Sequence, residues 1–385
     1  MSSKQTAEEA FGEVEKDLHE ISRWMFDNPE IQYQEYQSSA RLSSYLADHG
    51  FEVDYPAHGL DTAFSATVGT SGPRVVICCE YDALPEVGQA CGHNIIATAA
   101  LGAGIAVAGL VDELGLRVTV LGTPAEEGGG GKVDLIDAGA FEDAAASMMI
   151  HPSPKDTLDP SFQARSSYTV EYHGKESHAA FAPHVGVNAL DAFVQAYMNT
   201  ATLRQQILGS DRVHCIIDQG GDASNIIPAY TRSTWGIRSA NSERLEELIP
   251  KVHACFEAAA RATGCELDIT PKGHPYLNMI NNRVMTELFQ ANSTSLGRPL
   301  PTEAEQGASG GSSDMGNVSQ VVPSIHPMIA IEAGGAVNHQ KDFAAATVTE
   351  SGEAAIRDGA LAMAFTIIDL AEGDHWASLH GANDG

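Results

Sequence analysis

Residues 74–93 read RVVICCEYDALPEVGQACGH and join a buried strand to a group of metal-binding side chains. Residues 75–79 form a short apolar run without helical periodicity, which predicts a central strand covered on both faces. The segment DALP then ends this strand, and Cys91 and His93 follow at the start of a small-residue segment that we expect to be helical. Thiolate and imidazole are both good ligands of zinc and related metals. The stretch therefore predicts a strand that leads into a metal site.

The composition limits the classes of protein that fit this stretch. A chain of 385 residues can form one large domain or two ordinary ones with a sizeable core. It carries 22 Lys and Arg against 51 Asp and Glu, a net charge of -29. Because nucleic acids and anionic membranes repel such a surface, we expect neither as a partner.

The N-terminal segment and the cysteines indicate the compartment. Residues 2–17 are polar and acidic and lack the apolar region of a signal peptide. No apolar run approaches the roughly 20 residues that a membrane span requires. The six cysteines, with Cys78 and Cys79 adjacent, do not resemble a disulfide framework. We therefore expect a cytoplasmic protein.

Strand and helix patterns alternate through the first part of the chain. A helix at residues 95–110 follows the central strand, and further strands are predicted at 116–121 and 147–150. This order predicts an α/β fold with a mixed, mainly parallel sheet and helices on both faces. Ligands of such sheets bind beyond the carboxyl ends of the strands.

Four residues with metal-binding side chains closely follow these predicted strands. They are Asp82, Glu126, Glu127 and His151. We expect them to meet along one edge of the sheet, near Cys91.

The pattern changes after about residue 166, where a β-α-β-β-α-β order predicts an inserted ferredoxin-like unit. Its predicted elements are 168–173, 187–203, 213–219, 231–237, 242–262 and 265–270. We predict three segments: residues 1–166 and 274–385 form a catalytic domain in two parts, and 167–273 form the inserted domain.

Each candidate ligand also has a structural interpretation. A cysteine in an apolar context usually packs in a core, and a pair of glutamates usually lies on a solvated surface. However, Glu126 and Glu127 lie between an apolar strand and four glycines, and His339 lies in a polar loop. Cys91, His93, His151, His339 and one glutamate would give five ligands, enough for two ions that share the Cys91 thiolate as a bridge. The second glutamate would then act as a general base toward a metal-bound water.

The glycine run at residues 128–131 suggests a phosphate-binding loop, but the spacing excludes it. A P-loop needs a further glycine where Glu126 stands, and Ser or Thr where Val133 stands.

The motifs DALP, ACGHN, PAEEGGGGK, GxxxHAAxAP, SNIIP and a late GxxNHxxxF occur in this order. The series resembles the di-metal aminoacylase and carboxypeptidase family. More narrowly, it is similar to the branch of p-aminobenzoyl-glutamate hydrolase, β-alanyl-lysine-type dipeptidases and indole-acetyl-amino-acid hydrolases. The resemblance covers about residues 15–370.

This resemblance implies a role for each matching residue. The implied metal ligands are Cys91, His93, Glu127, His151 and His339, with Asp82 orienting a ligand histidine and Glu126 as the general base. It implies that the inserted domain forms a homodimer, and that His178 reaches the partner subunit's site to stabilise the oxyanion. Asn225 and Arg238 are the implied substrate-binding residues, with Arg238 on the substrate carboxylate. The implied catalytic domain is of the phosphorylase/hydrolase-like type.

The chain departs from the family pattern at one position beside the site. Many relatives carry His-x-Asp after the first strand, whereas this chain reads Glu80-Tyr81-Asp82. The second ion would then rely on His93.

The expected function is hydrolysis of the amide bond in an N-acyl amino acid or dipeptide by a metal-bridging water. Two divalent ions are expected, zinc by the ligand types, with manganese as the alternative. Two other functions remain open: hydrolytic deamination of an aromatic amine on the same site, and a non-catalytic binding protein. A release assay with both substrate types, together with metal analysis, separates them.

Overall fold

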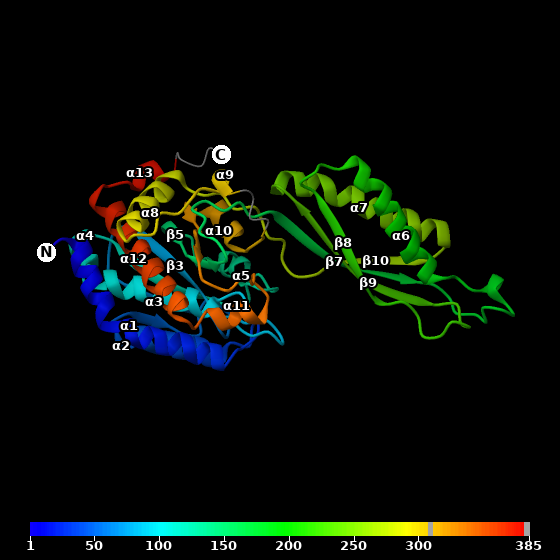
Figure 1. Ribbon diagram of the computed structural model, residues 1–385. Helices are drawn as coiled ribbons and strands as arrows, with labels where there is room; N and C mark the ends of the chain where they lie inside the picture. The colour runs from blue at the N-terminus through cyan, green and yellow to red at the C-terminus, as the bar shows by residue number, and fades with distance from the viewer. Residues whose placement is uncertain (307–310, 381–385) are drawn as a thin grey trace. The chain divides into compact units, whose positions relative to one another are not determined.

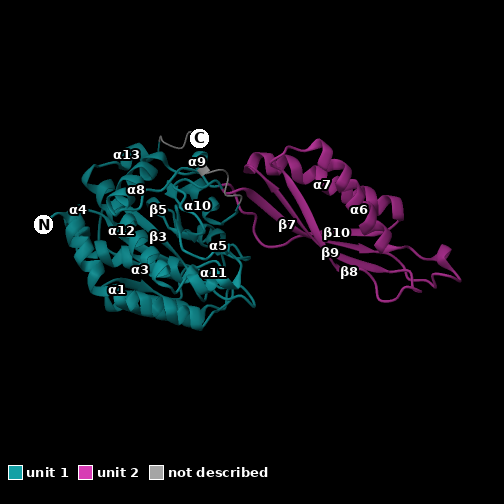
Figure 2. Ribbon diagram, viewed as in Figure 1, with its two compact units in different colours: residues 1–161, 279–385 teal, residues 162–278 magenta. Residues whose placement is uncertain are grey.

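The structure is a computed structural model that describes residues 1–306 and 311–380. The chain divides into two compact units, which we call unit 1 (residues 1–161 and 279–385) and unit 2 (residues 162–278) (Figure 2). Unit 2 extends beyond the predicted segment 167–273 at both ends. The reason is backbone pairing of Arg165 with Tyr276, whose N–H groups donate to each other's carbonyls at 2.8 and 3.0 Å.

Unit 1 is a mixed α/β structure, as the sequence predicts (Figure 1). Its strands are β1 (Glu52–Asp54), β2 (Phe64–Val68), β3 (Arg74–Glu80), β4 (Arg117–Thr123), β5 (Ala144–Met148), β6 (His151–Ser153), β11 (Ser324–Ile325) and β12 (Met328–Ala330). Its helices are α1 (Ser3–Asp27), α2 (Tyr36–Asp48), α3 (His93–Ala108), α4 (Val111–Leu114), α5 (Gly131–Asp137), α8 (Arg283–Ser295), α9 (Glu303–Gln306), α10 (Met315–Val321), α11 (Lys341–Ala346), α12 (Glu350–Glu372) and α13 (Trp376–Leu379).

The six-stranded sheet of unit 1 has the order β1-β2-β4-β3-β5-β11. Strands β4, β3, β5 and β11 are mutually parallel, whereas β1 and β2 add an antiparallel edge. Every residue of β3 is buried, which agrees with the apolar run in the sequence and with a central strand.

Helices cover both faces of this sheet. Successive side chains of a strand point to opposite faces, so Cys79 and Glu80 at the end of β3 face different helices. The Cys79 Sγ atom lies 3.8 Å from the carbonyl of Ala97 in α3, on the side of the large core that also contains α1 and α12. Glu80 contacts Lys132 of α5 on the other side.

The sequence prediction for the strand before His151 was wrong in detail. Residues 147–150 are not one strand, because β5 ends at Met148 and His151 begins β6. The chain changes partner here: β5 pairs with β11, whereas β6 pairs with β12 in a separate two-stranded sheet. His151 still lies beyond the carboxyl end of β5.

Unit 2 has the element order β-α-β-β-α-β. Its elements are β7 (Ala164–His173), α6 (Ala189–Leu203), β8 (Arg212–Gln219), β9 (Tyr230–Ser239), α7 (Ser242–Thr263) and β10 (Glu266–Pro271), with single turns at Pro183–Val185 and Arg204–Gln206. The strands form an antiparallel sheet in the order β10-β7-β9-β8, and both helices pack on one face around Trp235 and Phe256 (Figure 2). This element order is that of a ferredoxin-like unit.

Within residues 1–306 and 311–380, none of the helices has both the length and the apolar character that crossing a bilayer would require.

Candidate metal centre

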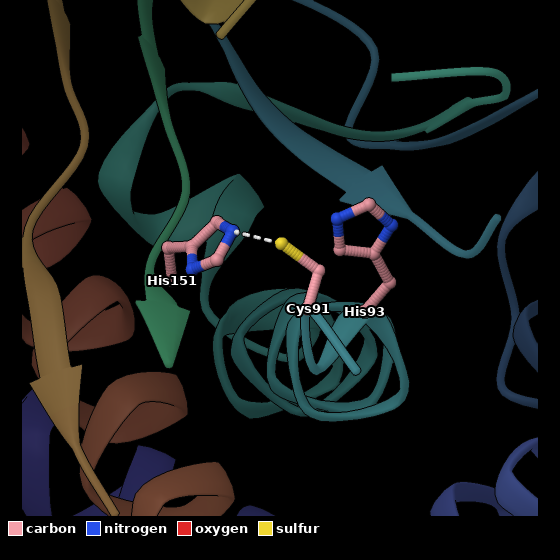
Figure 3. A group of neighbouring side chains, drawn as sticks. All are labelled: Cys91, His93 and His151. Carbon is pink, nitrogen blue, oxygen red and sulfur yellow. Dashed lines mark hydrogen bonds between the residues drawn. The ribbon is translucent and has the colours of Figure 1, made fainter. Parts of the chain in front are cut away.

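The turn before α3 directs Cys91 and His93 to the same side. Gly92, the residue between them, has a φ of +83°, and a Cβ there would lie 2.4 Å from the Cγ atom of Pro152. Only glycine fits this left-handed and crowded position. Figure 3 shows the result: the Cys91 thiol and the His93 ring project from the start of α3, and the His151 ring meets the thiol from a neighbouring strand.

The Cys91 thiol lies between two imidazoles. Its Sγ atom is 3.6 Å from Nε2 of His151 and 3.7 Å from Nε2 of His339. A tetrahedral zinc ion with bonds of about 2.3 Å to sulfur and 2.0–2.1 Å to nitrogen would hold these atoms about 3.6 Å apart. The separations therefore fit ligands of a shared ion.

Glu127 joins this group from the loop after β4. Its Oε2 atom lies 3.7 Å from Nε2 of His339, and its Oε1 atom lies 3.9 Å from Nε2 of His93. The side chain of His339 is 60% exposed, so it forms the open side of an otherwise buried cluster.

A second group of donors surrounds Nε2 of His93. This atom lies 3.5 Å from Oε2 of Glu80 and 4.0 Å from Oε2 of Glu126. His93 Nε2, Glu80 Oε2 and Glu127 Oε1 are buried and make no hydrogen bond to any residue in the described part of the chain. Buried polar atoms normally have a bonding partner, so this cluster fits a bound cation that all three atoms would contact. Among residues 1–306 and 311–380, potential ligand atoms form three overlapping sets: Cys91 with His93 and His151, Cys91 with Glu127 and His339, and Glu80 with His93 and Glu126.

Asp82 bonds both to His93 and to the backbone of the loop that carries Glu126 and Glu127. Its Oδ1 atom lies 3.2 Å from Nδ1 of His93 and accepts the backbone N–H of Glu126 at 3.1 Å. Its Oδ2 atom accepts the backbone N–H of Glu127 at 3.0 Å. Burial raises the pKa of Asp82, but these hydrogen bonds outweigh it, so the net pKa is lowered. A carboxylate here fixes Nδ1 of His93 as the protonated nitrogen and leaves Nε2 free to bind a metal.

His151 is held in the same tautomer by a different acceptor. Its Nδ1 atom lies 2.7 Å from the carbonyl of Pro152, so Nε2 faces Cys91. Burial and the neighbouring His93 lower the pKa of His151 to about 4, which keeps the imidazole neutral near pH 7. A neutral imidazole is the form that binds a metal.

The carboxylates give the site an excess of negative charge. Burial, together with the charges of Glu80 and Glu127, raises the pKa of Glu126 well above its ordinary value. Burial also raises the pKa of Glu127. A divalent cation would relieve this repulsion, and the pKa of Glu126 suits a group that accepts and returns a proton.

Sequence reasoning missed Glu35, which supports the loop that carries both glutamates. This fully buried carboxylate accepts the backbone N–H of Ala125 at 2.9 Å and that of Tyr33 at 3.0 Å. Ala125 has a φ of +60°, so the loop is held in a conformation that alanine rarely adopts. Burial raises the pKa of Glu35 to about 7. No local pattern identifies this residue, because its partner Ala125 lies 90 positions further along the chain.

The remaining predicted residues lie in unit 2. His178 and Asn225 are on two neighbouring loops, where the Ala179 N–H donates to the Asn225 carbonyl at 2.9 Å. The His178 ring is exposed, and its Nδ1 atom accepts the backbone N–H groups of Ala180 and Phe181 at 3.2 and 3.1 Å.

Arg238 lies far from these loops within unit 2. It is near the end of β9, whereas the loop with Asn225 precedes the start of that strand at Tyr230. Eight residues of extended strand span about 26 Å. The structure thus brings His178 and Asn225 together, but not Arg238.

A buried cluster of thiolate, imidazole and carboxylate donors beyond parallel strands is typical of metal-dependent hydrolases. The model of Peptidase family M20/M25/M40 matches residues 79–365, more than half of the chain, and the chain belongs to this family. It is accordingly a metal-dependent hydrolase of peptide or amide bonds.

Individual relatives agree with this assignment. The chain is 41% identical to the Xaa-Arg dipeptidase of Mus musculus over 95% of its own length and 88% of that relative. It is 31% identical to one of the subunits of the p-aminobenzoyl-glutamate hydrolase of Escherichia coli K12, over 63% of this chain and 55% of that protein. A dinuclear metal-binding M20 peptidase from Bacillus subtilis has the same fold, with a TM-score of 0.72 at 18% identity over 94% of this chain and 99% of that one.

Proposed function

We propose that this protein is a dipeptidase with two divalent ions, which removes a C-terminal basic amino acid from a dipeptide. The observation that carries the proposal is the 41% identity to an Xaa-Arg dipeptidase over 95% of the chain. The net charge of -29 supports it, because an acidic surface attracts cationic substrates.

The proposed ligands are Cys91, His93, Glu127, His151 and His339, with zinc as the first expectation and manganese as the second. When bound, such ions supply a Lewis acid that polarises the scissile carbonyl and lowers the pKa of water. Asp82 would keep His93 oriented, and Glu126 would take a proton from the attacking water and return it to the leaving amine. His178 would donate a hydrogen bond to the oxyanion, and Asn225 would support the same state. Arg238 would pair with the substrate carboxylate.

The separation within unit 2 supports a dimer. A dipeptide spans only about 7 Å, whereas about 26 Å of strand lies between Arg238 and the loop beside His178. One substrate could therefore meet both residues only if they come from different chains. We propose that His178 acts in the partner's site.

An apolar surface on unit 2 provides the proposed dimer contact. On α6, Val194, Tyr197 and Met198 are 50%, 43% and 56% exposed, and they lie on one face at helical spacing. Ile217, on the edge strand β8 and on the face of the sheet that α6 covers, is 39% exposed. An edge strand beside an apolar helix face is a surface that a second copy can cover symmetrically.

Substrate preference provides the test of the proposed function. In a panel of dipeptides, those that end in Arg or Lys should show kcat/KM at least about tenfold above those that end in Leu or Glu. C-terminal amides of the same peptides should be hydrolysed at least tenfold more slowly, because Arg238 would lack its carboxylate. N-acyl amino acids and aromatic amines complete the panel. Faster release of ammonia from an aromatic amine than of any amino acid would contradict the proposal.

Subunit complementation tests the role of His178. Glu126→Gln and His178→Ala homodimers should each retain less than about 1% of wild-type activity. A mixed dimer, however, would contain one site with both Glu126 and His178 intact. Co-expression with two affinity tags should yield purified mixed dimers with about half of the wild-type activity per dimer. Inactive mixed dimers would show that His178 serves its own chain.

A further inference from the structure

One carboxylate oxygen of Glu80, the last residue of β3, faces the ring of His93. Its side chain is fully buried, and one oxygen, Oε1, contacts the ammonium group of Lys132. The other oxygen, Oε2, makes no hydrogen bond to any residue among 1–306 and 311–380. It lies 3.5 Å from Nε2 of His93, which is buried and equally unsatisfied.

We propose that Glu80 is a metal ligand, which binds a cation together with His93 and Glu127. The inference rests on the proposed two-ion centre and adds a sixth side chain to its five ligands. The geometry favours it, because two ligand atoms about 2.0–2.2 Å from one ion lie roughly 3.4 Å apart when the ion is tetrahedral. Glu80, His93 and Glu126 form one of the three donor sets in the structure.

A purely structural role for Glu80, as a partner of Lys132, does not explain why its second oxygen is directed toward His93. Lys132 is fully buried and has two carboxylate partners, Glu80 and Asp314. Both carboxylate oxygens of Asp314 accept hydrogen bonds from Lys132. Oδ1 accepts from Nζ of Lys132 at 2.6 Å, and Oδ2 accepts from the backbone N–H of Lys132 at 3.0 Å. One ammonium group cannot neutralise two buried carboxylates. The Glu80 oxygen that does not contact Lys132 is the one that faces His93.

Lys132 therefore acts as a positioning residue for Glu80. It fixes one carboxylate oxygen, so that the other is held toward His93 and the side chain loses little conformational entropy on binding a cation. The donor atoms around the Cys91 thiol then differ from those around Glu80. Cys91, His151 and His339 offer sulfur and nitrogen, whereas Glu80 and its neighbours offer mainly oxygen, which suits harder cations.

Metal stoichiometry tests the inference, with Glu80→Gln and Asp314→Asn as matched variants. Both replace a carboxylate contact of Lys132 by an amide, but only the first removes an oxygen that faces His93. Metal-free proteins would be dialysed against Zn²⁺ and, separately, Mn²⁺, and analysed for bound metal over a range of free concentrations. Absorption of Co²⁺-loaded protein would report binding by the Cys91 thiolate.

The wild type and Asp314→Asn should bind two ions per chain. Glu80→Gln should keep one ion and the cobalt–thiolate absorption, but bind the second ion at least about 10- to 100-fold more weakly. Two ions with wild-type affinities in Glu80→Gln would overturn the inference and leave the two-ion centre intact. Fewer than two ions in the wild type would overturn the centre itself. If Glu80→Gln does not fold, the anomalous diffraction of Mn²⁺ in wild-type crystals decides: a cation in contact with Glu80 is expected, and two cations that both lie away from it would refute its role.

Discussion

Replacement of Glu126 by glutamine should lower kcat by about 10²- to 10⁴-fold while the bound metal remains. Glutamine keeps the length of the side chain and the backbone N–H that donates to Asp82 at 3.1 Å, so the loop should hold its conformation. It cannot accept a proton at neutral pH. Dipeptide turnover measured beside elemental analysis on the same sample separates lost chemistry from lost metal.

The matched control for this variant is Glu86→Gln. Glu86 is an exposed glutamate in the loop between β3 and α3, so the same chemical change should leave kcat within about twofold of wild type. Turnover of Glu126→Gln above about one tenth of wild type, with full metal content, would show that another group takes the proton.

The residues predicted from sequence were recognisable because their types are unusual for their surroundings. A cysteine and a histidine beside a buried strand, or two glutamates between an apolar strand and four glycines, are difficult to explain by packing alone. The mixed α/β fold was predictable for a related reason, because the apolar runs and their connections have a clear period. The structure confirms that fold in unit 1.

Long-range ion pairs could not be predicted in the same way. Lys132 lies 52 positions from Glu80 and 182 positions from Asp314. A signal did exist: once a P-loop was excluded, the lysine after four glycines had no assigned partner. Which carboxylates would neutralise it depends on the approach of α5 to β3 and α10, and no local pattern encodes that approach.

The order of the strands in the sheet of unit 2 could not be predicted from the sequence either. The β-α-β-β-α-β order of unit 2 follows from periodicity, but the arrangement β10-β7-β9-β8 depends on pairing between distant strands. That arrangement determines which strand is an edge. It therefore decides that Ile217 of β8 lies at an edge of the sheet, on the face that α6 covers and on which the proposed dimer depends.

The remaining variant with a large expected effect is Cys91→Ser, because the thiol belongs to two of the three donor sets. A serine hydroxyl has nearly the same shape, but it stays protonated near neutral pH and binds zinc far more weakly than a thiolate.

The Cys91→Ser protein should lose at least one of its two ions and fall below about 1% of wild-type kcat. Glu80 and Glu127 both lie near Nε2 of His93, and none of these three residues has a thiol, so they should retain a weakly held ion. Elemental analysis and dipeptide turnover would measure the two effects. The Cys255→Ser variant provides the control, since Cys255 on α7 in unit 2 donates to the carbonyl of Lys251 at 3.4 Å, a bond that serine can also make. If Cys91→Ser kept both ions and more than half of its activity, a bridging thiolate would be excluded, and the metal centre would have to be built from imidazole and carboxylate alone.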